Sequence, residues 1–121
     1  MLDTSGQNGI SFCHFRDTRV KNAKIGLHLK TTISGWINGN TFENILLDQS
    51  AYHIRLEAES GTTKGTNRNF FKHVIGQSLS GYTRAGLDAD TMVGTSNEFD
   101  DVKFWDLAGS GVFSTHIKAS V

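Results

Sequence analysis

A phenylalanine recurs along the chain at a nearly constant spacing, and the hydrophobic and polar positions around it keep the same order. The anchors are Phe15, Phe42, Phe71 and Phe99, which are 27, 29 and 28 residues apart. The residues two places before them are Cys13, Asn40, Asn69 and Asn97. The residues three places after them are Thr18, Ile45, Val74 and Val102. Agreement at several positions indicates an internal repeat of about 28 residues.

A second hydrophobic pattern follows each anchor. Residues 26–29, 53–56, 86–89 and 111–114 alternate in a way that is typical of half-buried strands. The residues expected to point inward are Leu27, Leu29, Ile54, Leu56, Leu87, Ala89 and Val112. Clusters of Gly, Ser, Thr and Asn, such as residues 60–67, separate the strands and predict loops. Residues 42–59 could also form an amphipathic helix, but the other copies of the pattern favour strands here as well.

A single repeat cannot bury its apolar residues, whereas stacked repeats can, with like residues lying over one another at about 4.8 Å. The phrases N-x-F-x-(N/D)-(I/V) and G-(I/L)-x-L, over residues 9–115, resemble the coils of the right-handed parallel β-helix family. That family includes phage tail spikes, other appendages and polysaccharide lyases.

The resemblance implies an all-β fold, a right-handed single-stranded parallel β-helix of about four coils of about 28 residues each. The predicted domain organisation is an N-terminal tail at 1–8 followed by the β-helix domain at 9–121. A jelly-roll sandwich would also contain many short strands, but it gives no reason for the repeat length.

Polar residues also occupy fixed positions in the repeat. The position after each anchor should face solvent, and its charge alternates from coil to coil: Arg16, Glu43, Lys72 and Asp100. Opposite charges that stack in this way set the register, each pair contributing a few tenths of a kcal/mol. The Asn residues before the anchors are expected to stack and to satisfy turn backbone groups. His73 shares its position with two Asp and an Asn, which predicts a hydrogen-bonded turn residue.

Composition and charge argue against several classes of partner and site. Twelve Lys and Arg balance twelve Asp and Glu, and the basic residues are scattered, so no nucleic-acid partner is predicted. No apolar run approaches the roughly 20 residues of a membrane-spanning helix, and the first ten residues lack the features of a secretion signal. The single Cys13 excludes an intramolecular disulfide and a cysteine zinc site. The five histidines show no H-x-x-x-H spacing, so no metal site or cofactor is predicted from them.

Acidic residues on the second set of strands are the candidate catalytic groups. Alternation places Asp88 and Asp90 on one face about 6.5–7 Å apart, with Glu57 on the adjacent coil. Carboxylates at such separations serve as acid and base or nucleophile in glycoside hydrolysis. The same acids could hold Ca²⁺, as in some of the β-helical lyases that the fold resembles. Ordinary surface charge is the favoured interpretation of these acids, since acidic residues are common along the chain.

Aromatic side chains are the candidates for carbohydrate binding, because their faces pack against the apolar faces of sugar rings. They are Trp36, Tyr52, Tyr82 and Trp105, and Arg55 lies on the same outward face as the acids. Tyr82 falls in the long insertion at 76–86, where a loop could carry recognition.

Two functions from different classes fit these observations. The first is a non-catalytic structural or glycan-contacting module of a viral tail spike, fibre or cell-surface appendage, on a virion or extracellular surface. The resemblance implies a homo-oligomer, with a trimer favoured, and polysaccharide as a further partner. The alternative is a polysaccharide-degrading enzyme, a hydrolase or lyase. The small number of coils favours the non-catalytic function, because enzymatic grooves in this family generally span more coils.

Overall fold

Short strands and turns make up the described part of the chain. A computed structural model describes residues 2–4, 9–78, 85–106 and 114–120, and these residues contain no helix. The first sheet contains β1 (Leu2–Thr4), β4 (Ile25–Thr31), β7 (Tyr52–Ala58) and β10 (Ala85–Thr91). The second contains β2 (Gly9–Ser11), β5 (Trp36–Asn38) and β8 (Gly65–Asn67). The third contains β3 (His14–Lys21), β6 (Thr41–Asp48), β9 (Phe70–Ser78), β11 (Glu98–Asp106) and β12 (Ser114–Ser120).

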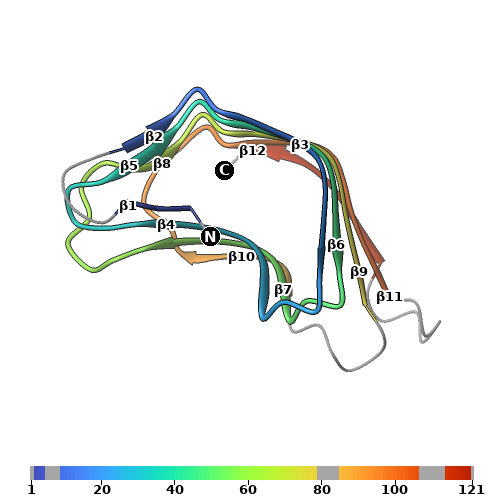
Figure 1. Cartoon of the computed structure of the whole chain (residues 1–121). Coiled ribbons are helices and arrows are strands. Elements are labelled where there is room, and N and C mark those ends of the chain that lie inside the picture. Colours follow the sequence, from blue (N-terminus) through green and yellow to red (C-terminus); the bar gives the residue numbers. More distant parts are fainter. Residues whose placement is uncertain (1, 5–8, 79–84, 107–113, 121) are drawn as a thin grey trace.

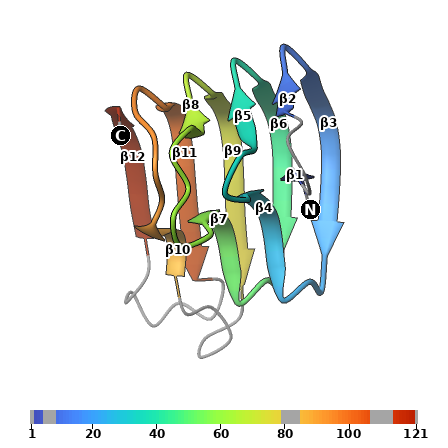
Figure 2. The same cartoon turned by 90° about the vertical axis from the view of Figure 1, so that its left-hand side faces the viewer.

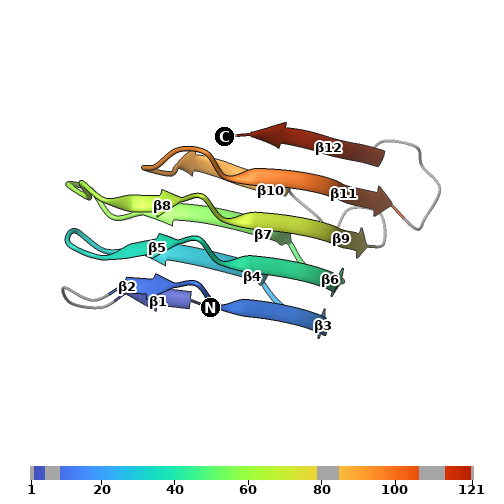
Figure 3. The same ribbon diagram turned by 90° about the horizontal axis from the view of Figure 1, so that it is seen from above.

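The chain visits the three sheets in turn, so that each coil lies on the one before it (Figure 1). Strands of successive coils pair in parallel and in register, which excludes the jelly-roll alternative. Seen from the N-terminal end in Figure 1, the chain turns clockwise as it moves away from the viewer, and Figure 3 shows the coils advancing along one axis. The fold is therefore the predicted right-handed parallel β-solenoid, and residues 42–59 form β6 and β7 instead of a helix.

The solenoid has about three turns, one fewer than predicted. The second sheet holds three strands, and the chain reverses after β11, because β12 pairs antiparallel with β11 instead of beginning another coil. The predicted strand at 111–114, including Val112, lies almost wholly outside the described residues. At the other end, Leu2–Thr4, in the segment assigned to an N-terminal tail, forms β1 and pairs in parallel with β4. No helix in the described ranges is long and apolar enough to cross a membrane.

The anchor phenylalanines form a continuous stack inside the solenoid, as predicted. Ring centroids are 5.1 Å apart between Phe15 and Phe42, 5.0 Å between Phe42 and Phe71, and 4.6 Å between Phe71 and Phe99, with the rings nearly parallel. Phe42, Phe71 and Phe99 are buried, whereas Phe15, at the end of the stack, is only partly buried. Aromatic stacking therefore runs along the axis through all four anchor positions.

A ladder of buried asparagines runs beside the phenylalanine stack. The Asn40 side chain donates to Asn69 Oδ1, and the Asn69 side chain donates to Asn97 Oδ1, both at 2.9 Å. Each of these amides also donates to a backbone carbonyl, as from Asn69 Nδ2 to Ile37 O at 2.8 Å. The predicted role of these residues is confirmed, since buried polar groups need such partners. Cys13 ends the ladder, because its backbone N–H donates to Asn40 Oδ1 but its side chain offers no amide.

A column of residues with positive φ breaks the alternation of the third sheet two places after each anchor. These residues are Asp17, Asn44, His73 and Asp101, with φ between 50° and 54°. Asn, Asp and His tolerate this conformation better than most residues. The resulting bend turns both the anchor and the residue three places later toward the core. His73 Nδ1 lies 2.7 Å from Asp101 Oδ2, which confirms His73 as a hydrogen-bonded turn residue.

The charge column has the predicted register. Arg16 lies opposite Glu43, Glu43 opposite Lys72, and Lys72 opposite Asp100. Glu43 also contacts a residue two positions along β3 from Arg16, because its Oε2 lies 2.9 Å from His14 Nε2. Each inner member of the column therefore has an opposite charge in both neighbouring coils.

Reversing one inner charge should destabilise the protein by an amount that depends on salt. We expect Glu43→Lys to lower the free energy of unfolding by about 0.5–1.5 kcal/mol at low salt, because it creates two like-charge contacts. At 1 M salt the Debye length falls to about 3 Å, and the penalty should shrink. Urea denaturation of Glu43→Lys and of Glu59→Lys, an exposed residue outside the column, measures the effect at both salt concentrations. Equal behaviour of the two variants would show that the column does not stabilise the coil register.

Candidate functional site

The outward face of β4, β7 and β10 carries the predicted acidic residues. In the register of the first sheet, His28 lies opposite Arg55 and Arg55 lies opposite Asp88. Arg55 Nε is 3.3 Å from Glu57 Oε2 and 3.3 Å from Asp88 Oδ2. The guanidinium group therefore lies between two carboxylates, and both are ion-paired.

Glu57 is held ionised by its neighbours. Its carboxylate lies 3.1 Å from His28 Nε2 and 3.5 Å from Lys30 Nζ. Desolvation alone would raise the pKa of Glu57, but the hydrogen bond to His28 and the charges of Arg55 and Lys30 bring it below the ordinary value. Burial lowers the pKa of His28 in spite of its contact with Glu57. A general acid needs a raised pKa, so this environment acts against proton donation by Glu57.

The placement of Asp90 in the acid cluster stays a prediction. The register of β10 against β7 shifts between Asp88 and Thr91, so that Thr91 and not Asp90 lies opposite Glu57. Between these paired positions β10 therefore contains one residue more than β7, as in a β-bulge. The Asp90 side chain lies outside the described residues. Within the described ranges, no group of three or more His, Cys, Asp and Glu side chains is arranged to hold a metal ion.

A groove crosses the outer face of the second sheet and its turns. We name it the Trp36 groove after its largest residue; its principal members are Phe12, Trp36, Asn38, Asn67, Arg68 and Thr95. These residues come from successive coils, so the groove runs along the solenoid axis. By the strand spacing it spans roughly 14 Å, which is long enough for a short oligosaccharide.

The aromatic side of the groove is Trp36. Its ring covers Gly9 in the preceding coil so closely that a Cβ atom there would lie 2.1 Å from the indole. Trp36 Nε1 donates to Ser11 Oγ at 3.1 Å, and Lys64 Nζ lies 4.8 Å from the ring centroid. The indole is thus held in place on the surface while remaining partly exposed.

The polar side of the groove is an amide ladder of its own. Asn67 Nδ2 donates to Asn38 Oδ1 at 3.1 Å, and the backbone N–H of Thr95 donates to Asn67 Oδ1 at 2.9 Å. The neighbouring turn residues Phe12, Gly39, Arg68 and Ser96 all have positive φ. Phe12 is 88% exposed and lies against Gly39, where a Cβ atom would come within 2.9 Å of its ring. A turn with positive φ therefore recurs at the equivalent position of successive coils along the groove.

The predicted carbohydrate-binding aromatics lie on different surfaces. Trp36 lines the groove, whereas the Tyr52 ring lies under the Arg55 guanidinium at 5.2 Å on the acidic face. Trp105 is 40% exposed near the end of β11. Tyr82 lies outside the described residues. The other four principal groove residues were not predicted as a site, although they share a sequence signal: each is a polar residue three or four places before an anchor.

Comparison of the chain with protein-family models, with curated proteins and with solved structures finds no match. The geometry described above therefore carries the functional argument.

Proposed function

We propose that the chain is a non-catalytic β-solenoid module that contacts acidic glycans through the Trp36 groove, as part of a tail spike, fibre or cell-surface appendage. The observation that carries this proposal is the combination in one groove of aromatic faces with exposed polar groups. Trp36 and Phe12 offer apolar faces, while Asn38, Asn67 and Thr95 offer amide and hydroxyl groups. Sites for small polar ligands commonly combine such apolar walls with a few placed polar groups.

The charge of the groove supports an anionic glycan. Arg68 is exposed among the lining residues, and the Lys64 ammonium lies over the Trp36 ring. Among the described residues that line the groove, none is acidic. A carboxylated or sulfated sugar would be attracted to Arg68 and Lys64, and Arg can bind a carboxylate through two parallel hydrogen bonds.

Binding should depend on Trp36 and Arg68. We expect Trp36→Ala to weaken the binding of polygalacturonate at least tenfold, a loss of about 1.4 kcal/mol. Arg68→Gln should weaken polygalacturonate binding but leave the weaker binding of neutral dextran unchanged. The matched control is Trp105→Ala, which removes an exposed tryptophan on another sheet. Isothermal titration calorimetry gives the affinities, and thermal melting shows that each variant is folded.

Equal polygalacturonate affinity in the folded wild type and in the folded Trp36→Ala variant would contradict the proposal. The alternative function, a polysaccharide hydrolase or lyase, would use Glu57 and Asp88. Both carboxylates pair with Arg55 at 3.3 Å, an arrangement that favours a structural role. Release of reducing ends or unsaturated sugars from the same polysaccharides would favour the enzyme instead.

A further inference from the structure

The two ends of the third sheet differ in whether another strand covers the edge of the solenoid. At the C-terminal end, β12 pairs with β11 and covers its outer edge. At the N-terminal end, β3 is the last strand of the sheet and pairs with β6 on one side only (Figure 2). Within the described residues, the other edge of β3 has no strand beside it. An uncovered edge strand offers a row of backbone donors and acceptors to another strand.

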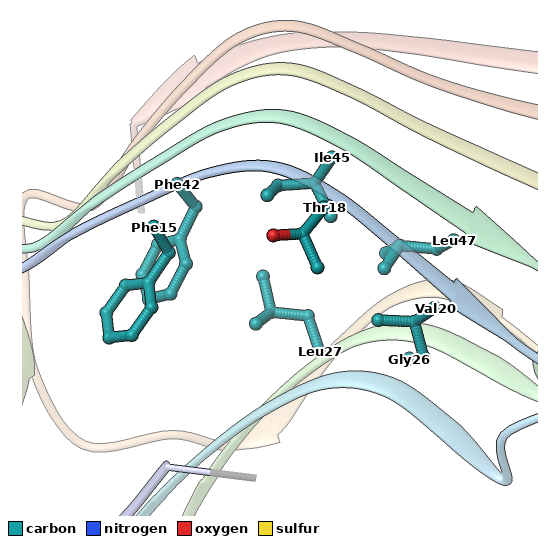
Figure 4. A pocket seen from close by; sticks show the side chains of 8 residues that line it. All are labelled: Phe15, Thr18, Val20, Gly26, Leu27, Phe42, Ile45 and Leu47. Carbon is teal, nitrogen blue, oxygen red and sulfur yellow. The ribbon is translucent and has the colours of Figure 1, made fainter.

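The apolar interior is also open at this end. Phe15, Thr18 and Val20 of β3 and Leu27 of β4 line a pocket, with Phe42 and Ile45 of the next coil behind them (Figure 4). Phe15, Val20 and Leu27 are only partly buried, whereas their counterparts in the next coil, Phe42, Leu47 and Ile54, are buried. In the described part of the chain, the short β1 pairs with Leu29–Thr31 of β4 and not with the first part of that strand. A strand added to β3 would bury this surface.

The side chains that an added strand would need follow from the register of the coils. Within the third sheet, an aromatic ring lies over each anchor ring and an opposite charge lies over each charge of the column. The outward cations of β3 are Arg16, Arg19 and Lys21. Arg19 already binds Asp48 at 2.6 Å, and Arg16 is 69% exposed with Asp17 at 3.9 Å. An added strand should therefore carry acids over Arg16 and Lys21.

We propose that this end of the solenoid binds an acidic β-strand of a partner protein, which adds in parallel register to β3. The strand would place apolar residues over Phe15 and Val20 and carboxylates over Arg16 and Lys21. Charge disfavours a second copy of this chain as the occupant. Two copies of β3 would bring cations together, and β12, at the opposite end, contains His116 and Lys118 but no acid.

The sequence of β6 supplies a suitable probe. The peptide NTFENILLD, residues 40–48, already pairs with β3 from its other side, placing Glu43 over Arg16 and Asp48 over Lys21. We expect the fluorescently labelled peptide to bind the intact protein, as measured by anisotropy. The charge-swapped peptide NTFKNILLK should bind at least tenfold more weakly, and binding of the original peptide should weaken at high salt. A protein with Arg16→Glu and Lys21→Glu should reverse the preference.

Cross-linking tests the register independently. Cys13 is exposed at the start of this edge, and position 40 of the peptide would lie beside it. The strand spacing of about 4.8 Å is compatible with a disulfide between the two positions. In a glutathione redox buffer, the peptide CTFENILLD should form a disulfide with Cys13, whereas NTFENILLC should not. The reverse preference would overturn the parallel register, and absence of both binding and cross-linking would overturn the proposal. If the protein self-associates and Lys21→Glu abolishes that self-association, the occupant is a second copy of the chain. That result would also overturn the proposal.

Discussion

Replacing Phe71 by Ala should lower the free energy of unfolding by about 3–5 kcal/mol. Phe71 is fully buried and stacks on Phe42 at 5.0 Å and on Phe99 at 4.6 Å. The neighbouring rings belong to strands whose separation is fixed by backbone hydrogen bonds, so they cannot move together to fill the space. The variant loses the stacking contacts on both sides and keeps most of the cavity, which makes the cost large.

Urea denaturation compares Phe71→Ala with Phe12→Ala. Phe12 is 88% exposed, so its removal should change the free energy of unfolding by less than about 1 kcal/mol. The two variants remove the same atoms and differ in whether those atoms are buried. A Phe71→Ala protein as stable as the Phe12→Ala protein would mean that the stack does not hold the coils together.

Acidification should destabilise the protein through His53. Its side chain is fully buried, its ring stacks on Phe104 at 5.6 Å, and its Nε2 lies 3.4 Å from Ser78 Oγ. Burial lowers the pKa of His53 from 6.5 to about 4. The unfolded chain therefore binds a proton at a higher pH than the folded chain does. The stabilisation of the fold by neutral His53 is therefore fully present above pH 6.5, and it is lost as the pH falls toward 4.

The expected loss is about 2 kcal/mol between pH 7 and pH 5 and about 3 kcal/mol near pH 4. His28, whose pKa is also lowered, acts in the same direction. The carboxylates of Asp48 and Glu57 have lowered pKa values, so they lose their stabilising effect only below the ordinary pKa of such groups, near 4. A His53→Leu variant isolates the contribution, because it should show a flatter dependence of unfolding free energy on pH over the range 7 to 5. Parallel curves for the two proteins would contradict a buried neutral His53.

The sequence was sufficient to predict the stacking of the coils. The Phe15 and Arg16 positions recur with the same neighbours, and a shift of one residue would turn every such side chain to the other face. The repeat pattern did not show where individual strands would depart from regular pairing. The bulge between Asp88 and Thr91 is one, since a single added residue in a strand leaves no composition signal. The reversal at β12 is another, because a strand-like stretch does not show the direction in which it will pair.

His53 shows why burial of a polar residue was missed. The alternation of residues 53–56 predicted that Ile54 points inward, but it gave no prediction for the burial of His53. In the register of the first sheet, Gly26 and Gly86 occupy the corresponding positions of the neighbouring coils. Gly76 of β9 is also adjacent, and a Cβ atom there would lie 2.5 Å from the His53 ring. Gly76, distant in sequence, leaves space for the His53 ring, and only the assembled coils bring the two residues together.

The Trp36 groove could be predicted only in part for a similar reason. The polar residues Asn38, Asn67 and Thr95 stand four places before their anchors, so a column was readable from the chain. The outward direction of this column depends on the turns with positive φ that follow it. The exposed Phe12 belongs to the groove because Gly39 leaves room for its ring, a contact between coils that local sequence does not reveal.

The parallel coil pairing also determines how the chain can acquire its fold. Each contact along the Phe stack and the Asn ladder joins residues separated by one repeat, as with Phe42 and Phe71 or Asn40 and Asn69. Closing a loop of that length costs entropy before any strand pairing offsets it. We therefore expect pairing of the first two coils to be the slow step of folding, after which each later coil adds to an existing edge. Because β6, β9 and β11 are each paired on both sides, we expect folding to begin in the middle of this sheet and the solenoid to grow toward both ends.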